Sequence, residues 1–237
     1  MQRNKLPSII LVNPQLPENI GLSARAMMNC GFKDLRIIEP REKWPNKTAV
    51  QSSAKAKNII KNAKIFTNIN EATSDLKFLI ATSVRKRFLN KKHYYNFNDV
   101  LSNIANLDNI GVLFGPEKSG LTNQHISKCD CILTLPTFNN KLSLNLSHSV
   151  LLTCYELNKL KKIKNKKSVL HKLATKKEFN YLMENLYYNL KKNGFLKNPE
   201  KRKSMFINIQ NMFIKAQLSS QEISTFRGII ESLIKQK

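Results

Sequence analysis

Short apolar runs alternate with amphipathic stretches through the first two-thirds of the chain. The runs hold three to five residues, which suits strands buried on both faces. The predicted strands are 8–12, 35–39, 65–67, 78–82, 111–114 and 131–135. The stretches between them predict helices at 18–30, 49–63, 99–107, 123–129 and 143–161. This alternation predicts an α/β fold with a largely parallel sheet.

The pattern changes near residue 159. Nine lysines fall between residues 159 and 177, and no strand-like run follows them. Apolar residues then recur at helical spacing in three stretches, 178–192, 204–215 and 221–234. We therefore predict three parts: an α/β domain over 1–160, a basic linker over 161–177 and a helical C-terminal extension over 178–237.

The net charge of the chain is +24, from 40 basic and 16 acidic side chains in 237 residues. A surface this basic attracts polyanions, and nucleic acid is the first candidate partner. However, 32 of the basic residues are lysine, and asparagine adds 28 more residues with A/T-rich codons. Genome composition can therefore raise the charge without any function behind it, and the charge favours nucleic acid without establishing it.

Composition and the N-terminal residues limit the class of protein to which the chain can belong. Hydrophobic residues make up 41% of the chain, which is enough for a packed core. No run of 18 apolar residues predicts a membrane-spanning helix. The N-terminus, residues 1–7, is polar and leads directly into the first strand, so we expect no signal peptide, no membrane association and a cytoplasmic protein.

Four cysteines occur in the chain. They form no C-x-x-C pair, and we expect buried free thiols at Cys30, Cys129, Cys131 and Cys154. His125 lies near two of them in the sequence. The spacing fits no zinc module and a fourth ligand is missing, so we predict no metal site.

Three polar segments follow predicted strands, and ligands bind at these carboxyl ends in open α/β sheets. The first segment is Asn19-Ile-Gly-Leu-Ser-Ala-Arg25. Gly21 permits the close approach of another element. Asn19 and Arg25 lie six residues apart on a helix and do not share a face. Arg25 is either a buried cation that needs an anionic partner or a surface residue of an amphipathic helix.

The second segment is Leu113-Phe-Gly-Pro-Glu-Lys-Ser-Gly-Leu121. Gly115 and Gly120 have the separation found in a phosphate-binding loop. Leu121 stands where that loop requires lysine, which argues against a nucleotide phosphate site. Glu117 is placed to hold a basic or hydroxyl group, and the alternative for the whole segment is an ordinary glycine-rich turn.

The third segment runs from Leu135 to Ser147 and opens the helix predicted over 143–161. Ser143 fits the N-cap position of that helix, and Asn145 lies in the cap region. Each segment alone is weak support for a function, so their joint occurrence and order carry the information.

In this order the segments resemble the three motifs of the SpoU family of RNA 2′-O-ribose methyltransferases, in the SPOUT superfamily. The first motif is N-x-G-x-x-x-R, here Asn19 to Arg25, and the second is F-G-x-E-x-x-G-L, here Phe114 to Leu121. The third is S-L-N-V-S, here Ser143 to Ser147 with leucine in place of valine. Further segments, including Phe226-Arg227-Gly228-Ile229, are similar to the TrmJ type within this family.

The resemblance implies a deep trefoil knot in a parallel-sheet methyltransferase domain, residues 1–160, and a homodimer with the site near its interface. It implies S-adenosylmethionine as methyl donor and no metal. The implied acceptor is a ribose 2′-hydroxyl of tRNA, at nucleotide 32 of the anticodon loop. The implied cofactor-binding residues are Thr82, Ser83, Val84, Gly115, Leu135, Leu142, Ser143 and Leu144.

The catalytic residues that the resemblance implies are Arg25, Asn19, Glu117, Ser143 and Asn145. Arg25 would activate the hydroxyl, in the site built mainly by the other subunit, and the rest would orient Arg25, the cofactor and the ribose. A guanidinium is a weak base, so Arg25 either acts in an unusual environment or mainly stabilises negative charge.

Two other functions remain open at this point. The substrate could be ribosomal RNA, because the motifs do not separate RNA classes. The chain could also be an inactive RNA-binding relative, although such a protein is expected to lose Arg25, Glu117 or Asn145, and all three are present. The lysine-rich linker would either grip the tRNA body or form a solvated hinge.

Overall fold

A seven-stranded parallel sheet forms the centre of the computed structural model, which describes residues 6–85, 91–104, 107–135, 137, 143–159 and 173–235. The strand order is β3-β2-β1-β6-β4-β7-β5. The strands are β1 (Ser8–Val12), β2 (Leu35–Ile38), β3 (Lys64–Phe66), β4 (Phe78–Thr82), β5 (Lys92–Tyr94), β6 (Ile110–Phe114) and β7 (Cys131–Leu133). The predicted α/β fold with a parallel sheet is confirmed.

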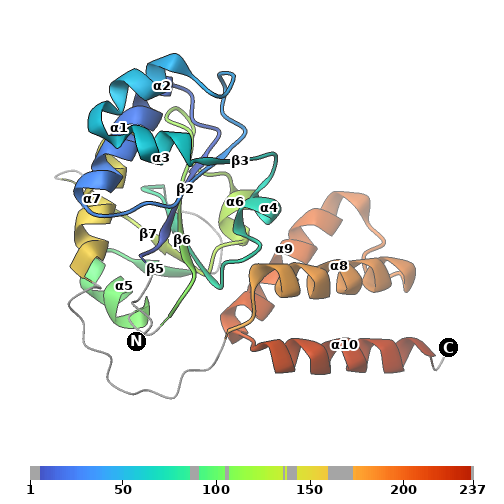
Figure 1. Ribbon diagram of the computed structural model, residues 1–237. Helices are drawn as coiled ribbons and strands as arrows, with labels where there is room; N and C mark the ends of the chain where they lie inside the picture. Colours follow the sequence, from blue (N-terminus) through green and yellow to red (C-terminus); the bar gives the residue numbers. More distant parts are fainter. Residues whose placement is uncertain are drawn as a thin grey trace.

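Helices cover both faces of this sheet (Figure 1). They are α1 (Pro17–Asn29), α2 (Lys47–Ser52), α3 (Lys57–Lys61), α4 (Ile69–Thr73), α5 (Phe97–Ile104), α6 (Asn123–Ser127) and α7 (Leu146–Leu157), with a 3-10 turn, η1 (Ala54–Ala56). In β1, Ile9 and Leu11 pack with α1 and α7, whereas Ile10 and Val12 pack with α4 and α6. Burial on both faces explains why the strands read as continuous apolar runs.

Two predicted helices differ from the observed ones. The helix expected over 49–63 is broken into α2, η1 and α3, because Ala54 adopts a left-handed backbone with φ of 50°. The helix expected from residue 143 begins at Leu146, and its N-cap is Asn145, whose Oδ1 accepts the N–H of Ser147 at 2.8 Å. The assignment of Ser143 as N-cap is therefore wrong.

The C-terminal residues form the three predicted helices, α8 (Lys176–Lys192), α9 (Pro199–Ala216) and α10 (Ser220–Lys235). Their shared core includes Phe179, Leu182 and Ile214. In the described part of the chain, α8 packs against α4 and α9 against α6. Most of the predicted linker, residues 161–172, lies outside the described residues. The division into three parts stays a prediction, as does the trefoil knot.

A buried ion pair fixes α8 to the α/β part. Lys176 Nζ lies 2.8 Å from Asp130 Oδ2, and the two side chains are 8% and 6% exposed. The same carboxylate accepts the N–H of Leu79 at 2.6 Å, and the N–H of Lys176 donates to the Leu76 carbonyl at 2.7 Å. The contact therefore joins the first turn of α8 to the start of β4.

Replacing Lys176 by methionine is expected to lower the free energy of unfolding by about 3–5 kcal/mol, because it leaves the Asp130 carboxylate buried and unpaired. The neighbouring exposed Lys177 supplies the matched control, and Lys177→Met should change stability by no more than about 0.5 kcal/mol. Urea unfolding measures both. Equal effects of the two substitutions would show that the ion pair does not contribute.

All four cysteines are free and buried, as predicted. Burial raises the pKa of Cys129 to about 12 and that of Cys131 well above its usual value, so neither is a reactive thiolate near neutral pH. Within the described ranges, no group of three His, Cys, Asp or Glu side chains is arranged to hold a metal ion. In the same ranges, every helix is too short or too polar to cross a membrane.

Candidate active site

The three polar segments meet at the carboxyl edge of the sheet. Strands β1 and β6 are neighbours, with Leu11 opposite Phe114, so the loops that follow them lie side by side. The Glu117 carboxylate accepts the N–H of Gln15 at 2.9 Å and that of Leu16 at 3.3 Å. It thereby ties the loop after β6 to the entry of α1.

A chain of side-chain hydrogen bonds continues from Glu117 to the third segment. Asn19 Nδ2 donates to Glu117 Oε1 at 2.8 Å, and Asn145 Nδ2 donates to Asn19 Oδ1 at 3.0 Å. Asn145 Oδ1 in turn accepts from the hydroxyl of Ser147 at 2.7 Å. Asn19 therefore uses both atoms of its amide to join one residue from each of the other two segments.

This network brings together three of the five expected catalytic residues, Asn19, Glu117 and Asn145. Because their polar atoms bind one another and the backbone, their arrangement supports a positioning role rather than direct contact with reacting atoms. Arg25 is exposed on α1, and its side chain forms no hydrogen bond or ion pair with the described residues. Of the two alternatives given for Arg25, a buried cation or a surface residue, the single chain shows the surface residue. The hydrogen-bond network does not orient the Arg25 side chain.

A cavity of about 260 Å³ opens beside the network, between the ends of β4, β6 and β7 and the start of α7. Seven of the eight residues expected to bind the cofactor line it: Thr82, Ser83, Val84, Gly115, Leu135, Ser143 and Leu144. Glu117 lines it as well. The eighth expected residue, Leu142, lies outside the described residues. The residues expected to bind the cofactor therefore lie together around one cavity, and their role in binding stays a prediction.

The cavity wall is held by side-chain bonds to neighbouring strands. Thr82 Oγ1 donates to the Leu113 carbonyl at 2.8 Å, and Thr134 Oγ1 donates to the Ser83 carbonyl at 2.8 Å. Mixed apolar and polar lining of this kind is typical of small-molecule sites. The shape is consequently set by the sheet itself rather than by the loops alone.

Two glycines permit close backbone contacts at the site. A Cβ on Gly115 would lie 2.2 Å from the Leu121 backbone nitrogen and 2.4 Å from the Gly120 carbonyl carbon. A Cβ on Gly21 would lie 2.3 Å from the Ala49 carbonyl oxygen on α2. Gly115 therefore keeps the loop closed over the cavity, and Gly21 lets α2 pack against α1.

Sequence reasoning missed several residues that line the cavity. Arg85 and Lys118 bring two cations to the cavity. Leu121 adds an apolar side chain to its wall, and Ser149 adds a hydroxyl group. Arg85 directly follows the predicted cofactor stretch and Lys118 directly follows Glu117 in the second motif. Their place next to motif residues was the available signal.

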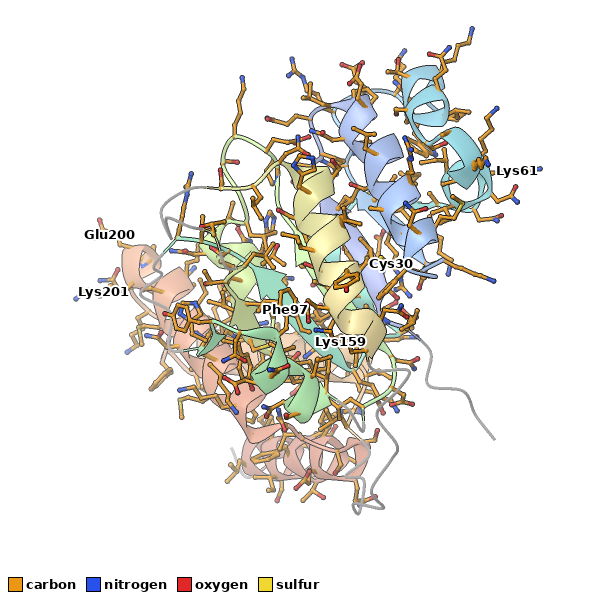
Figure 2. The ribbon with its side chains drawn as sticks, turned by 90° about the vertical axis from the view of Figure 1, so that its left-hand side faces the viewer. Cys30, Lys61, Phe97, Lys159, Glu200 and Lys201 are labelled. Carbon is orange, nitrogen blue, oxygen red and sulfur yellow. The ribbon has the colours of Figure 1, made fainter. Side chains whose placement is uncertain are left out.

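The exposed face of α1 carries Arg25 between two apolar side chains, Leu22 and Met28. Helix α7 packs beside α1 (Figure 2). It exposes Leu151, Leu152 and Tyr155, the last to 63%. Apolar side chains at this density on two adjacent helices are typical of a surface that another protein covers.

Replacing Asn145 by alanine is expected to weaken both cofactor binding and turnover, because it removes the α7 cap and the bond to Asn19. The loss of the cap alone costs about 1 kcal/mol. Asn145→Ser, which keeps a capping hydroxyl but cannot reach Asn19, separates the two effects. If the serine variant matches wild type in both binding and turnover, the network does not position the site.

Comparison with known proteins supports the assignment made from the motifs. A model of the SpoU rRNA methylase family matches residues 7–155. The tRNA (cytidine-2′-O-)-methyltransferase TrmJ of Methanocaldococcus jannaschii is 40% identical over 162 residues, covering 67% of this chain and 70% of that protein. The tRNA (cytidine/uridine/adenosine-2′-O-)-methyltransferase TrmJ of Pseudomonas aeruginosa is 27% identical over 238 residues, covering 94% and 91%.

Among solved structures, TrmJ from Z. mobilis ZM4 matches with a TM-score of 0.88 and 33% identity, over 96% of this chain and 99% of that one. The chain therefore belongs to the SpoU methylase family. Its resemblance to the TrmJ type, first suggested by segments outside the three motifs, is confirmed by these relatives.

Proposed function

We propose that this protein is a tRNA 2′-O-ribose methyltransferase that uses S-adenosylmethionine, with nucleotide 32 of the anticodon loop as its target. The observation that carries the proposal is the convergence of all three motif segments on one cavity at the carboxyl edge of the sheet. The printed activities of the TrmJ relatives support the tRNA substrate and the ribose hydroxyl as acceptor.

The lining of the cavity fits a nucleoside with a thioether-like substituent. Leu135 and Leu144 offer apolar surface for a purine ring, while Thr82, Ser83 and Ser143 offer polar groups for a ribose and an amino acid moiety. When bound, the cofactor would supply an electrophilic methyl group on a sulfonium. The sulfonium sulfur is a good leaving group, so the transfer does not require a metal ion. We therefore assign cofactor binding to these residues with Val84, Gly115 and Leu142.

The protein is proposed to act as a homodimer. The apolar face of α1 and α7 supports this. Arg25 does not line the cavity of its own chain, and a second copy of the chain is the occupant that would bring an Arg25 to it. Asn19 faces the network while Arg25 lies on the exposed side of the same helix. Arg25 of each protomer would therefore serve the cavity of its partner.

The chemical step would join the ribose 2′-oxygen to the methyl carbon as the sulfur–methyl bond breaks, which would leave a neutral thioether. The hydroxyl proton would pass to solvent water. We assign Arg25 to stabilising the negative charge that develops on the hydroxyl oxygen, with a neighbouring RNA phosphate as the second contact of its guanidinium. Asn19, Glu117 and Asn145 hold the loops that define the cavity, and Ser143 at its rim contributes to placing the ribose. Holding the hydroxyl in line with the methyl group accounts for much of the rate.

The experiment that tests this function is methyl transfer from labelled S-adenosylmethionine to unmodified bulk tRNA and, in parallel, to ribosomal RNA. Nuclease digestion then locates the label. Label in a 2′-O-methyl nucleotide of the anticodon loop supports the proposal. Label only in ribosomal RNA would keep the chemistry and reject the tRNA substrate, and cofactor binding without transfer to either RNA would favour an inactive relative.

A further inference from the structure

The exposed cations of the α/β part are distributed unevenly along the sheet. Residues 41–63, which include α2, η1 and α3, contain six cationic residues and one carboxylate, Glu42, a net charge of +5. Residues 93–117, which include α5 near the opposite edge of the sheet and lie between Lys92 and Lys118, contain no lysine or arginine. A genome-wide bias toward lysine would raise both segments alike, so it does not explain the difference.

All six cations of the first segment are exposed: Arg41, Lys43, Lys47, Lys55, Lys57 and Lys61. We call this set the α2–α3 band. None of the six forms an ion pair or a side-chain hydrogen bond with the residues that the structure describes. This differs from other lysines of the α/β part, such as Lys77 with Asp108 and Lys159 with Glu156.

The band adjoins the site through α1. Helix α1 packs against α2, η1 and α3, and the α2 backbone contacts Gly21, two residues after Asn19 of the network. Arg41 and Lys43 follow the carboxyl end of β2, on the same edge of the sheet as the cavity. Figure 2 shows Lys61 on α3 directed away from the body of the protein. The band therefore runs outward from the edge that holds the site.

We propose that the α2–α3 band binds the phosphate backbone of the substrate RNA outside the target nucleotide. Exposed lysines without carboxylate partners are suited to replacing the counterions of a polyanion, and they do so without reading sequence. No large hydrophobic side chain is exposed within residues 41–63, whereas a helix that binds a membrane surface needs an apolar face. The band lies at the other end of the molecule from α8–α10 (Figure 1), so it is separate from the helical extension.

This inference rests on RNA being the substrate. Its test compares the triple variant Lys55→Gln, Lys57→Gln, Lys61→Gln with a control that loses the same charge elsewhere in the α/β part, Lys33→Gln, Lys77→Gln, Lys92→Gln. Binding of a tRNA transcript to the full chain is measured over a series of salt concentrations, together with kcat and KM for methyl transfer.

In the band variant, the slope of the logarithm of the tRNA association constant against the logarithm of the salt concentration is expected to become less steep by about 2 to 3. Binding of tRNA should weaken on the order of 10-fold near physiological salt. Its KM should rise while kcat stays close to wild type, and the control should follow wild type. If the band variant and the control change alike, or neither changes, the band does not bind RNA. Binding of poly-glutamate, an acidic polypeptide, is measured alongside. If the band variant loses poly-glutamate binding while its tRNA salt slope stays unchanged, the proposal is overturned in favour of an acidic protein partner. A selective loss of tRNA binding in an enzyme that transfers no methyl group would instead keep the band and reject the proposed function.

Discussion

Replacing Arg25 by alanine is expected to lower kcat for methyl transfer by about 100- to 1,000-fold while leaving S-adenosylmethionine affinity within about twofold of wild type. A loss of kcat of this size is typical when one group that stabilises charge is removed from a reaction centre. Cofactor affinity should persist because Arg25 is exposed on α1 and does not line the cavity of its own chain. Single-turnover methyl transfer and direct cofactor binding measure the two quantities. Wild-type turnover in the alanine variant would remove Arg25 from the mechanism.

Mixing variants tests whether Arg25 acts in the partner's site. A chain with Arg25→Ala still has an intact cavity, and a chain with a disabled cavity still has Arg25. If each site takes its arginine from the other protomer, mixed dimers contain one complete site and should recover about a quarter of wild-type activity from two inactive parents. Arginine acting within its own chain predicts that the mixed dimers contain no complete site, so the mixture stays inactive.

The Gly115→Ala variant is expected to lose cofactor affinity on the order of 100-fold, and turnover at ordinary cofactor concentrations with it. An added Cβ would meet backbone atoms of Gly120 and Leu121 at 2.2–2.9 Å, and backbone cannot move aside as a flexible side chain can. The loop must therefore open, and it forms one wall of the cavity. Isothermal calorimetry with S-adenosylmethionine measures the loss.

Gly120→Asn is the matched control within the same loop. Gly120 has a positive φ of 64°, which asparagine tolerates better than most residues, and a Cβ there meets no atom within 4 Å. The control should therefore keep cofactor affinity close to wild type. Equal losses in both variants would show that the loop responds to any added side chain, and the close-contact explanation of Gly115 would be wrong.

The sequence predicted the sheet well because its strands are buried on both faces. Residues 8–12 and 78–82 were placed with the bounds that β1 and β4 have. Strand β5 was missed, since Lys92-His-Tyr94 is a short edge strand without an apolar run. Helix α4 was missed because it spans five residues and its main signal is the single capping residue Asn68.

The site was predicted in location but not in detail. The family resemblance implied the residues that line the cavity, and they lie together because loops after adjacent parallel strands share one edge of the sheet. The bonds from Asn19 to Glu117 and Asn145 span 98 and 126 residues of sequence, and no local pattern predicts such pairs. The sequence also did not predict the break at Ala54 in the helix expected over 49–63, since alanine normally favours a continuous helix.

The most direct test of the central claim uses two anticodon stem-loops that differ only in the loop sugars. One carries ribose throughout the loop and the other carries 2′-deoxyribose at the same positions, with unchanged bases. The account predicts methyl transfer to the ribose form and none to the deoxy form, with the product as a 2′-O-methyl nucleoside. Equal transfer to both forms would place the methyl group outside the loop sugars, and a product methylated on a base would contradict the assignment of this protein as a ribose methyltransferase.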